Sequence, residues 1–365
     1  MTGTDLRRSG GCCTFISMKL QSAFESVDMP AGLLFASDQT PGFTRLKRGK
    51  SFVYRQANGK PLNDARHISR IQKLAIPPAY TAVWICPQPQ GHIQATGLDA
   101  RGRKQYRYHA DWRLVKNQDK FDRLSDFGAA LPSIRANVNR DLVAFSSVDV
   151  QRNSVLAALV RLLDTTLVRV GNEEYARSNG SFGLTTLRKR HVDVQGSELH
   201  LRFRGKSGVE HDLRFANSRI ARIVRRCQTL PGQELFHYVA TTGEVHSVGS
   251  ADVNAYLEAA CKGKFTAKDF RCWHASVLAL QLWRKLSKAE QLEPTATQAN
   301  RLLAEVASHL GNTLAVCRKS YVHPRVLALL AGEAESHKTS AGRAKRRLGL
   351  TAGEQDFLAM MAGSV

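Results

Sequence analysis

A single tyrosine stands among cations near residue 320, in the stretch VCRKSYVHPRV. The charged or titratable neighbours of Tyr321 are Arg318, Lys319, His323 and Arg325. A phenol with a reference pKa of about 10 is almost fully protonated at neutral pH, so a tyrosine that attacks a phosphate needs help from nearby cations. A structural tyrosine with a solvated charged flank has the same local sequence. Residues elsewhere in the chain have to decide between these interpretations.

The stretch FTAKDFRCW carries a more specific pattern. Thr266 and Asp269 form a capping-box pair that starts a helix at Ala267. Lys268 and Arg271 are three residues apart and therefore share one face of the first turn. Two cations at the positive end of a helix dipole are unfavourable unless an anion binds there. This pattern favours a phosphate site.

Three other polar residues lie at the ends of predicted elements. Arg169 is near the end of the apolar core helix predicted between Asn153 and Gly171, where a cation also suits the helix dipole. Lys206 lies on the tip of a hairpin that follows the alternating ELHLRFR, although a solvated turn lysine is the commoner case. In LAEVASHLGN a helix ends at a glycine, and Asn312 follows at once.

The composition points to a polyanionic partner. The 365 residues carry 53 Lys and Arg against 31 Asp and Glu, a net charge of +22. Nucleic acid and an anionic membrane surface both fit such a charge. The excess is spread over the whole chain and forms no single basic helix, which favours nucleic acid. No apolar run reaches the roughly 18–20 residues that span a bilayer, so we expect no membrane segment.

The seven cysteines show no metal or disulfide pattern. Their number is odd, no C-x-x-C occurs, and no histidine cluster accompanies them. Structural zinc and a disulfide framework are therefore disfavoured, and a reducing cytosol fits better.

The periodicity predicts an α+β chain in three parts. Residues 1–28 have no clear pattern and suggest a flexible tail. Residues 29–113 contain mainly strand and turn signals, and we expect a small β-rich domain. Residues 114–365 contain mainly helical patterns with a short β interruption, and we expect a larger, mainly helical catalytic domain.

The order of the candidate residues resembles the active site of type IB DNA topoisomerases, most closely the small bacterial and poxvirus branch. The blocks that carry the resemblance are SFGLTTLRKRHV, FRGKSG, KDFR and LGNTLAVCRKSYVHP in the second half, and GHIQATGLDARGRKQYRYHADWR in the first. They match the landmarks of that family in order and spacing, and the resemblance covers about residues 30–365. It removes the structural interpretation of Tyr321.

The resemblance implies a fold and a set of roles. The fold is that of type IB topoisomerases and tyrosine recombinases, a C-shaped clamp of two lobes around duplex DNA. Tyr321 would bond to a DNA 3′-phosphate, and Arg169 and Arg271 would hold that phosphate. Lys206 would protonate the leaving 5′-oxygen, and Lys268 would assist as a second cation.

The resemblance extends to the first lobe and includes one departure. Gln105, Tyr106 and Tyr108 match the contacts that the family makes with the major groove and the phosphates. Poxvirus and eukaryotic members carry histidine where this chain has Asn312, which can donate a hydrogen bond but carries no charge. We interpret His309, one turn earlier, as a helix-surface residue.

The implied activity is the transient cutting of one strand, relaxation of positive and negative supercoils by strand rotation, and religation. A phosphotyrosyl ester conserves the energy of the broken bond, so no ATP is needed, and we expect neither a cofactor nor a metal. We expect a monomer that acts on double-stranded DNA in the cytoplasm, associated with the nucleoid.

Two other classes of protein stay open. A tyrosine recombinase or integrase uses a similar set of residues, but KDFR lacks the histidine that such enzymes usually carry three residues before the second arginine. A non-catalytic DNA-binding protein would need only the net charge, which leaves the ordered catalytic set without an explanation.

Overall fold

The computed structural model describes residues 29–49, 51–100, 102–146, 150–261, 263–290, 295–333 and 348–363. The tail predicted for residues 1–28 lies outside this part of the chain. The chain forms two compact units, Met1–Asp119 and Lys120–Val365, and the division falls inside the long helix α3 (Ala110–Val143).

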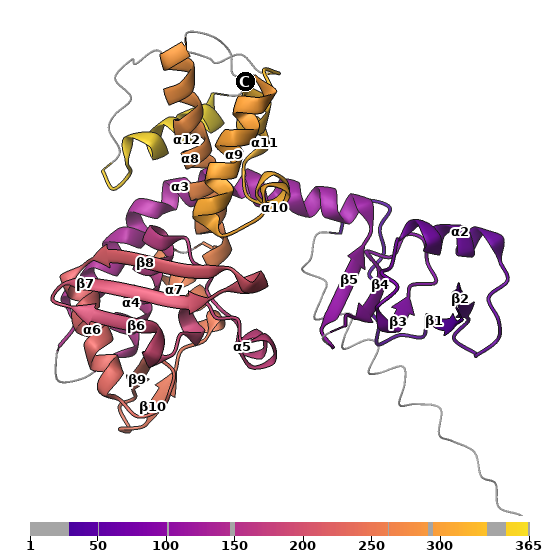
Figure 1. Cartoon of the computed structure of the whole chain (residues 1–365), viewed down its shortest axis with the longest axis horizontal. Coiled ribbons are helices and arrows are strands. Elements are labelled where there is room, and N and C mark those ends of the chain that lie inside the picture. The colour runs from indigo at the N-terminus through magenta and orange to yellow at the C-terminus, as the bar shows by residue number, and fades with distance from the viewer. Residues whose placement is uncertain are drawn as a thin grey trace, which may run out of the picture. The chain divides into compact units, whose positions relative to one another are not determined.

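The first unit is built on a five-stranded sheet in the order β2-β1-β3-β4-β5, and every neighbouring pair is antiparallel (Figure 1). Its strands are β1 (Phe43–Arg48), β2 (Ser51–Arg55), β3 (Thr81–Ile85), β4 (Ile93–Leu98) and β5 (Lys104–Tyr108). One helix, α2 (Ala65–Lys73), connects β2 to β3 and buries Ile71 in a small apolar core. The prediction of an N-terminal β-sheet is confirmed.

The second unit is mainly helical. Its helices after α3 are α4 (Arg152–Thr166), α5 (Glu173–Asn179), α6 (Ser218–Thr229), α7 (Ser250–Cys261), α8 (Ala267–Glu290), α9 (Ala296–Leu310), α10 (Leu314–Ser320), α11 (Pro324–Leu330) and α12 (Ala352–Ala362). The β interruption is a three-stranded sheet of β6 (Val192–Gln195), β7 (Glu198–Arg204) and β8 (Glu210–Ala216), with a small ribbon of β9 (His237–Val239) and β10 (Val245–Ser247). The predicted helical region is confirmed.

The core of the second unit surrounds α4, which packs against α6, α7 and α8. Most residues of α4 are buried, because its sequence is apolar on every face. Aromatic rings fill the space beside it: Phe127 packs edge-on against both Phe270 and Trp273, at 5.0 and 6.0 Å between ring centres. Gly128 lets the ring of Trp273 lie against α3, since a Cβ at this position would clash with it.

The predicted ends of the core helix were wrong. Helix α4 has Gln151 as its N-cap, two residues before Asn153, and its last residue is Thr166. Leu167 then adopts the left-handed conformation, with φ of 58°, and turns the chain out of the helix. Arg169 therefore lies in the loop after α4 and not at its end. The cause is tertiary, because a non-glycine residue is rarely left-handed without contacts that hold it there.

A buried ionic network ties four helices of the second unit together. Arg135 of α3 binds Asp164 of α4 at 2.8 Å and Glu354 of α12 at 2.8 Å. Two residues of α8 complete the network, since His274 contacts Asp164 at 2.9 Å and the indole of Trp273 donates to Glu354 at 3.2 Å. Removing one partner of a buried pair leaves the other charge uncompensated, so this network is a sensitive point of the fold.

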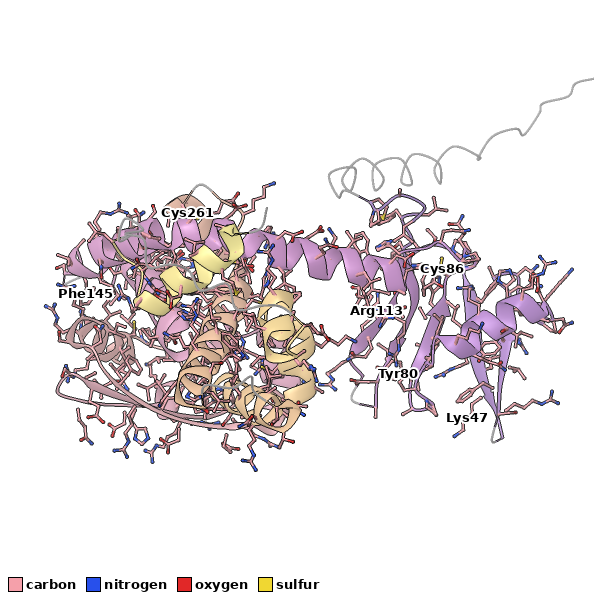
Figure 2. All side chains as sticks on the ribbon, turned by 90° about the horizontal axis from the view of Figure 1, so that it is seen from above. Lys47, Tyr80, Cys86, Arg113, Phe145 and Cys261 are labelled. Carbon is pink, nitrogen blue, oxygen red and sulfur yellow. The ribbon has the colours of Figure 1, made fainter. Side chains whose placement is uncertain are left out.

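The described cysteines are free thiols. They are Cys86, Cys227, Cys261, Cys272 and Cys317. Cys86 of the first unit and Cys261 of the second are marked in Figure 2. Burial raises the pKa of the Cys227 thiol to about 12, which keeps it protonated.

We predict that Arg135→Met destabilises the protein by about 3–5 kcal/mol, because Asp164 and Glu354 lose their buried partner. Urea unfolding of both proteins at neutral pH measures this difference. Lys116→Met is the matched control on the same helix, since the side chains of Lys116 and its partner Asp119 are 40% and 50% exposed and their ion pair should contribute less than about 1 kcal/mol. Equal stability of Arg135→Met and wild type would contradict the importance of the network.

The same network predicts a dependence on acid. Burial alone would raise the pKa of Asp164, but hydrogen bonds from His274 and Arg135 and their charges lower it below the ordinary value. A carboxyl whose pKa is depressed on folding stabilises the protein above its unfolded pKa of about 4, and this stabilisation is lost as the pH falls. Wild type should therefore lose more stability than Arg135→Met between pH values of about 5 and 3.

Candidate active site

A pocket of about 400 Å³ in the second unit collects the candidate residues. Five of them line it: Arg169, Lys206, Lys268, Arg271 and Tyr321. They come from the loop after α4, the turn between β7 and β8, the first turn of α8 and the residue after α10. The sixth, Asn312, contacts Arg169. Segments far apart in the sequence thus bring all six together.

The loop that carries Arg169 is held by a close backbone contact. The carbonyl of Arg169 accepts a hydrogen bond from the Leu184 amide at 2.9 Å. Gly183 lies so near that a Cβ on it would be 2.5 Å from Cα of Gly171 and 2.6 Å from the Arg169 carbonyl. Only glycine fits this crossing, and it fixes the backbone from which the arginine projects.

The side chain of Arg169 is directed by the turn after α9. Helix α9 ends at Leu310, and Gly311 takes the left-handed conformation with φ of 60°, as the sequence predicted. The guanidinium of Arg169 donates to the amide oxygen of Asn312 and reaches the Gly311 carbonyl at 3.5 Å. The amide nitrogen of Asn312 is buried and has no hydrogen-bond partner within the described residues. Asn312 therefore has an N–H group to offer to a bound anion.

Arg271 is buried at the start of α8, where its side chain is only 3% exposed. The predicted capping pair forms, because the Thr266 amide donates to the Asp269 carboxylate at 2.7 Å. The guanidinium of Arg271 donates to the Leu310 carbonyl at 2.7 Å and to the Leu167 carbonyl. These bonds leave its charge without a carboxylate partner in the described part of the chain.

Tyr321 lies directly under this charge. Cζ of Arg271 is 5.0 Å from the centre of the phenol ring. Burial alone would raise the pKa of Tyr321, but the charge of Arg271, a hydrogen bond from it and the charge of Arg169 together lower it below the ordinary value. The phenol is thus easier to ionise here than in water, as the sequence led us to expect from two nearby arginines.

Lys206 sits on the predicted hairpin tip. Strands β7 and β8 pair up to Arg204 and Glu210, and the turn between them has Ser207 and Gly208 at positive φ of 65° and 80°. The side chain of Lys206 is exposed and borders the pocket, as does that of Lys268. Both lysines can therefore approach a bound phosphate from the solvent side.

His211 also lies near this site, and no sequence motif pointed to it. It pairs with Phe203 across β7 and β8, and the two rings stack with 4.7 Å between their centres. Burial lowers the pKa of His211, and the charges of Arg169 and Arg271 lower it further. The sequence gives one indication that His211 lies near the site: it is on β8, the strand that follows the turn carrying Lys206.

His309 was interpreted as a helix-surface residue, and this is confirmed. Its side chain is exposed, and Nδ1 lies 2.9 Å from the carbonyl of Glu305 on the same helix.

The candidate DNA contacts of the first unit lie on β5, an edge strand of its sheet. Tyr106 and Tyr108 share one face, with their rings stacked at 5.8 Å, and Tyr106 is 44% exposed. Gln105 projects from the opposite face because side chains alternate along a strand, and its amide donates to Asp99 at 3.0 Å. The structure therefore groups the two tyrosines but separates Gln105 from them.

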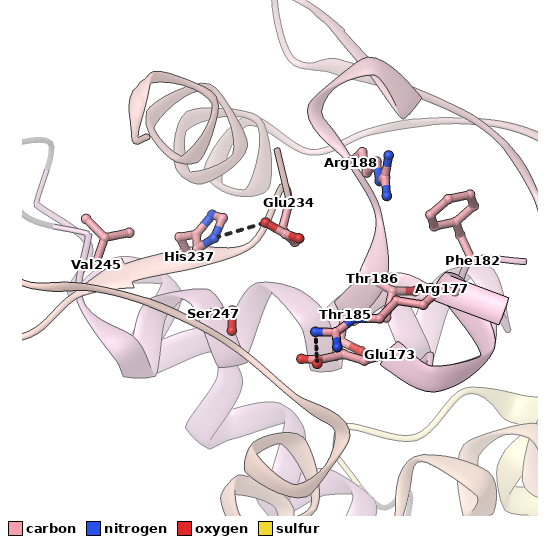
Figure 3. Close-up of a pocket in the computed structure, with 11 residues that line it drawn as sticks. Glu173, Arg177, Phe182, Thr185, Thr186, Arg188, Glu234, His237, Val245 and Ser247 are labelled. Carbon is pink, nitrogen blue, oxygen red and sulfur yellow. Dashed lines mark hydrogen bonds and ion pairs between the residues drawn. The ribbon is translucent and has the colours of Figure 1, made fainter. Parts of the chain in front are cut away.

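A second pocket of about 320 Å³ lies beside the first in the same unit, and Phe182 lines both (Figure 3). Its charged groups are largely paired: Arg177 with Glu173 at 3.4 Å, and His237 with Glu234 at 3.7 Å. The first pocket has four cations and no carboxylate in its lining. The positive electrostatic potential that would attract a phosphate is therefore found in the first pocket.

The described residues lack two other features. None of their helices is both long and apolar enough to cross a membrane. They contain no group of three or more His, Cys, Asp or Glu side chains that could hold a metal ion.

Two protein families match the chain. Residues 109–348 match the family described as "Eukaryotic DNA topoisomerase I, catalytic core". Residues 51–99 match the family described as "Bacterial DNA topoisomerase IB, N-terminal domain".

Individual proteins agree with these families. The "DNA topoisomerase 1B" of Acanthamoeba polyphaga mimivirus is 32% identical over 303 residues, which cover 80% of this chain and 89% of the viral protein. The "DNA topoisomerase 1B" of Vaccinia virus (strain Copenhagen) is 29% identical over 119 residues, 32% of this chain and 36% of that protein. The "DNA topoisomerase 1" of Mycosarcoma maydis is 24% identical over 217 residues, 53% of this chain and 21% of that protein.

The catalytic-core match spans most of the chain, and the mimivirus relative matches along nearly all of its own length. The N-terminal match adds a domain that is described for bacterial type IB enzymes. This chain therefore belongs to the type IB DNA topoisomerases, in their viral and bacterial-like branch.

Proposed function

We propose that this type IB DNA topoisomerase cuts one strand of duplex DNA with Tyr321 as its nucleophile. The phenolic oxygen bonds to phosphorus, the bond from phosphorus to the 5′-oxygen breaks, and the enzyme keeps the 3′-phosphate. Supercoils of either sign relax while the free 5′ end rotates, and the 5′-hydroxyl then attacks the phosphotyrosyl bond to reseal the strand. The observation that carries this proposal is the cationic pocket in which the Tyr321 ring lies under Arg271.

The roles of the surrounding residues follow from their chemistry. Arg169 and Arg271 would hold the non-bridging oxygens, because a guanidinium stays charged and offers several donors in one plane. The free N–H group of Asn312 would add a neutral hydrogen bond to the same oxygens. Donors placed where charge develops usually supply the largest catalytic contribution.

The leaving 5′-oxygen needs a proton. Lys206 is the proposed general acid, since it borders the pocket on an exposed turn, and Lys268 is a second cation on the same side. A general acid typically contributes about 10²–10⁴ in rate. Type IB topoisomerases are isomerases that need neither ATP nor a metal ion, because the phosphotyrosyl ester keeps the energy of the broken bond.

The proposal for the whole molecule is a C-shaped clamp on double-stranded DNA. Its lobes would be the β-rich domain of residues 29–113 and the catalytic domain of residues 114–365. Tyr106 and Tyr108 would meet the DNA from the first lobe, where their stacked rings are partly exposed. One chain supplies all six site residues, which supports a monomer, and the charge of +22 supports association with the nucleoid in the cytoplasm.

We predict that Tyr321→Phe abolishes relaxation of a supercoiled plasmid but leaves DNA binding intact. The change removes one oxygen and little volume, so the protein should still fold. A structural tyrosine would lose at most one hydrogen bond, about 0.5–1.5 kcal/mol, and relaxation would then persist in part. Wild type denatured in mid-reaction should carry DNA joined through its 3′-phosphate to the peptide that contains Tyr321, in EDTA and without ATP. An adduct at another tyrosine such as Tyr256, or at a 5′-phosphate, would refute the assignment.

We predict that Arg271→Ala slows cleavage more than Asn312→Ala does. Loss of an oxyanion donor typically costs about 10²–10³, and the arginine loses its charge as well. Single-turnover cleavage of a duplex oligonucleotide measures both rates. Asn312→His is the matched variant, since histidine can also donate a hydrogen bond, and it should cleave faster than Asn312→Ala. If Asn312→Ala cleaved more slowly than Arg271→Ala, the roles proposed for the two residues would be wrong.

We predict that DNA binding falls steeply with salt. Each neutralised phosphate contributes about −0.9 to the slope of log K against log[salt], so a clamp should give a slope of magnitude above about 4. Titrations of the Tyr321→Phe variant at several salt concentrations measure this slope without covalent bonding. A nearly flat response would contradict the clamp.

A further inference from the structure

Tyr321 stands at the end of a short helix whose backbone is held from outside. Helix α10 ends at Ser320, and Tyr321 is its C-cap residue. The Ser320 carbonyl accepts a hydrogen bond from the ammonium group of Lys120 at 2.9 Å. The Tyr321 carbonyl lies 3.4 Å from the hydroxyl of Ser276, which in turn accepts from the His323 amide at 2.9 Å.

These contacts come from two long helices. Ser276 belongs to α8, the helix that also carries Arg271 over the Tyr321 ring. Lys120 belongs to α3, which is far from α10 in the sequence. Helix α8 therefore contacts the tyrosine ring through Arg271 and holds the backbone two residues later through Ser276, and Lys120 adds an independent anchor from α3.

Lys120 is an unusual residue for a purely structural anchor. It is half-buried, its ammonium lies 3.8 Å from the centre of the Phe121 ring, and within the described residues it forms no ion pair. The pKa of Lys120 lies below its ordinary value, chiefly because burial lowers it. Cys272 raises this pKa in part, and the charge of Lys268 lowers it again. An ammonium held in this way needs a strong acceptor. The carbonyls at the negative end of α10 supply one.

We propose that Lys120 is a positioning residue for strand cleavage. By binding the Ser320 carbonyl it fixes the end of α10, and with it the direction from which the Tyr321 hydroxyl reaches the phosphate. Reacting atoms must be aligned closely, and a displacement of about 1 Å can cost about 10² in rate. This inference rests on the proposed role of Tyr321 as the nucleophile.

The test compares the rate of cleavage with the affinity for DNA. Lys120→Met should lower the single-turnover cleavage rate of a duplex oligonucleotide by about 10- to 100-fold. Its Kd, measured in a Tyr321→Phe background, should change by less than about 3-fold, since one charge is a small part of the phosphate-binding surface. Lys285→Met is the matched control: it removes an exposed lysine of α8 and should leave both quantities unchanged.

Two further measurements separate positioning from proton donation. In a substrate with sulfur at the bridging 5′ position, the leaving group is a thiolate, which needs no proton. A variant that lacks only the general acid should therefore cleave this substrate at a rate close to that of wild type. Lys206→Ala should recover with this substrate, and Lys120→Met should stay slow. Lys120→Arg should regain part of the rate, because a guanidinium can donate to the same carbonyl.

Three outcomes would overturn the inference. Lys120→Met could cleave as fast as wild type, its affinity for DNA could fall by the same factor as its cleavage rate, or its cleavage rate could recover with the sulfur substrate. If Lys120→Met fails to fold by circular dichroism, Ser276→Ala tests the same anchoring from α8. It should also slow cleavage without weakening binding, and unchanged cleavage would refute the anchoring. Absence of any adduct on Tyr321 in wild type would instead refute the proposed function.

Discussion

The charge of Arg271, buried beside the phenol of Tyr321, is the interaction on which this site depends. A buried guanidinium is normally neutralised by a carboxylate, and here carbonyl groups take that place. The two carbonyls that accept from it, those of Leu167 and Leu310, follow directly on α4 and end α9. Helix ends of this kind carry partial negative charge, enough to hold the cation without cancelling it. The remaining field acts on the tyrosine and on any phosphate that enters.

This constraint explains why the helices end where they do. Helix α4 stops at Thr166, and the carbonyl of the left-handed Leu167 that follows accepts a hydrogen bond from Arg271. Helix α9 stops at Leu310 by means of Gly311, and Asn312 then meets Arg169. The ends of the helices, rather than their lengths, place the two arginines next to each other.

Local signals in the sequence were enough for part of the site. The capping pair at the start of α8, the glycine that ends α9 and the turn that carries Lys206 all depend on neighbouring residues, and all were predicted correctly. The exit of the chain from α4 was not predictable, because the carbonyl of the left-handed Leu167 accepts from an arginine that is 104 residues away in the sequence. The same holds for Lys120, whose partner is 200 residues away. In the first unit, alternation along β5 separates Gln105 from the two tyrosines, a detail that a motif match does not contain.

Helix α12 lies after Tyr321 in the sequence, so its contacts form late when the chain is synthesised. His323, two residues after the proposed nucleophile Tyr321, packs edge-on against Phe357 of α12 at 5.8 Å, and Glu354 of the same helix joins the Arg135 network. A ribosome releases Tyr321 before it releases these residues, so the tyrosine emerges before the surface beneath its neighbour exists. A chain that ends before α12 lacks the Phe357 ring beside His323 and the Glu354 carboxylate that binds Arg135. The contact between His323 and Phe357 therefore forms only after the chain has been made as far as α12.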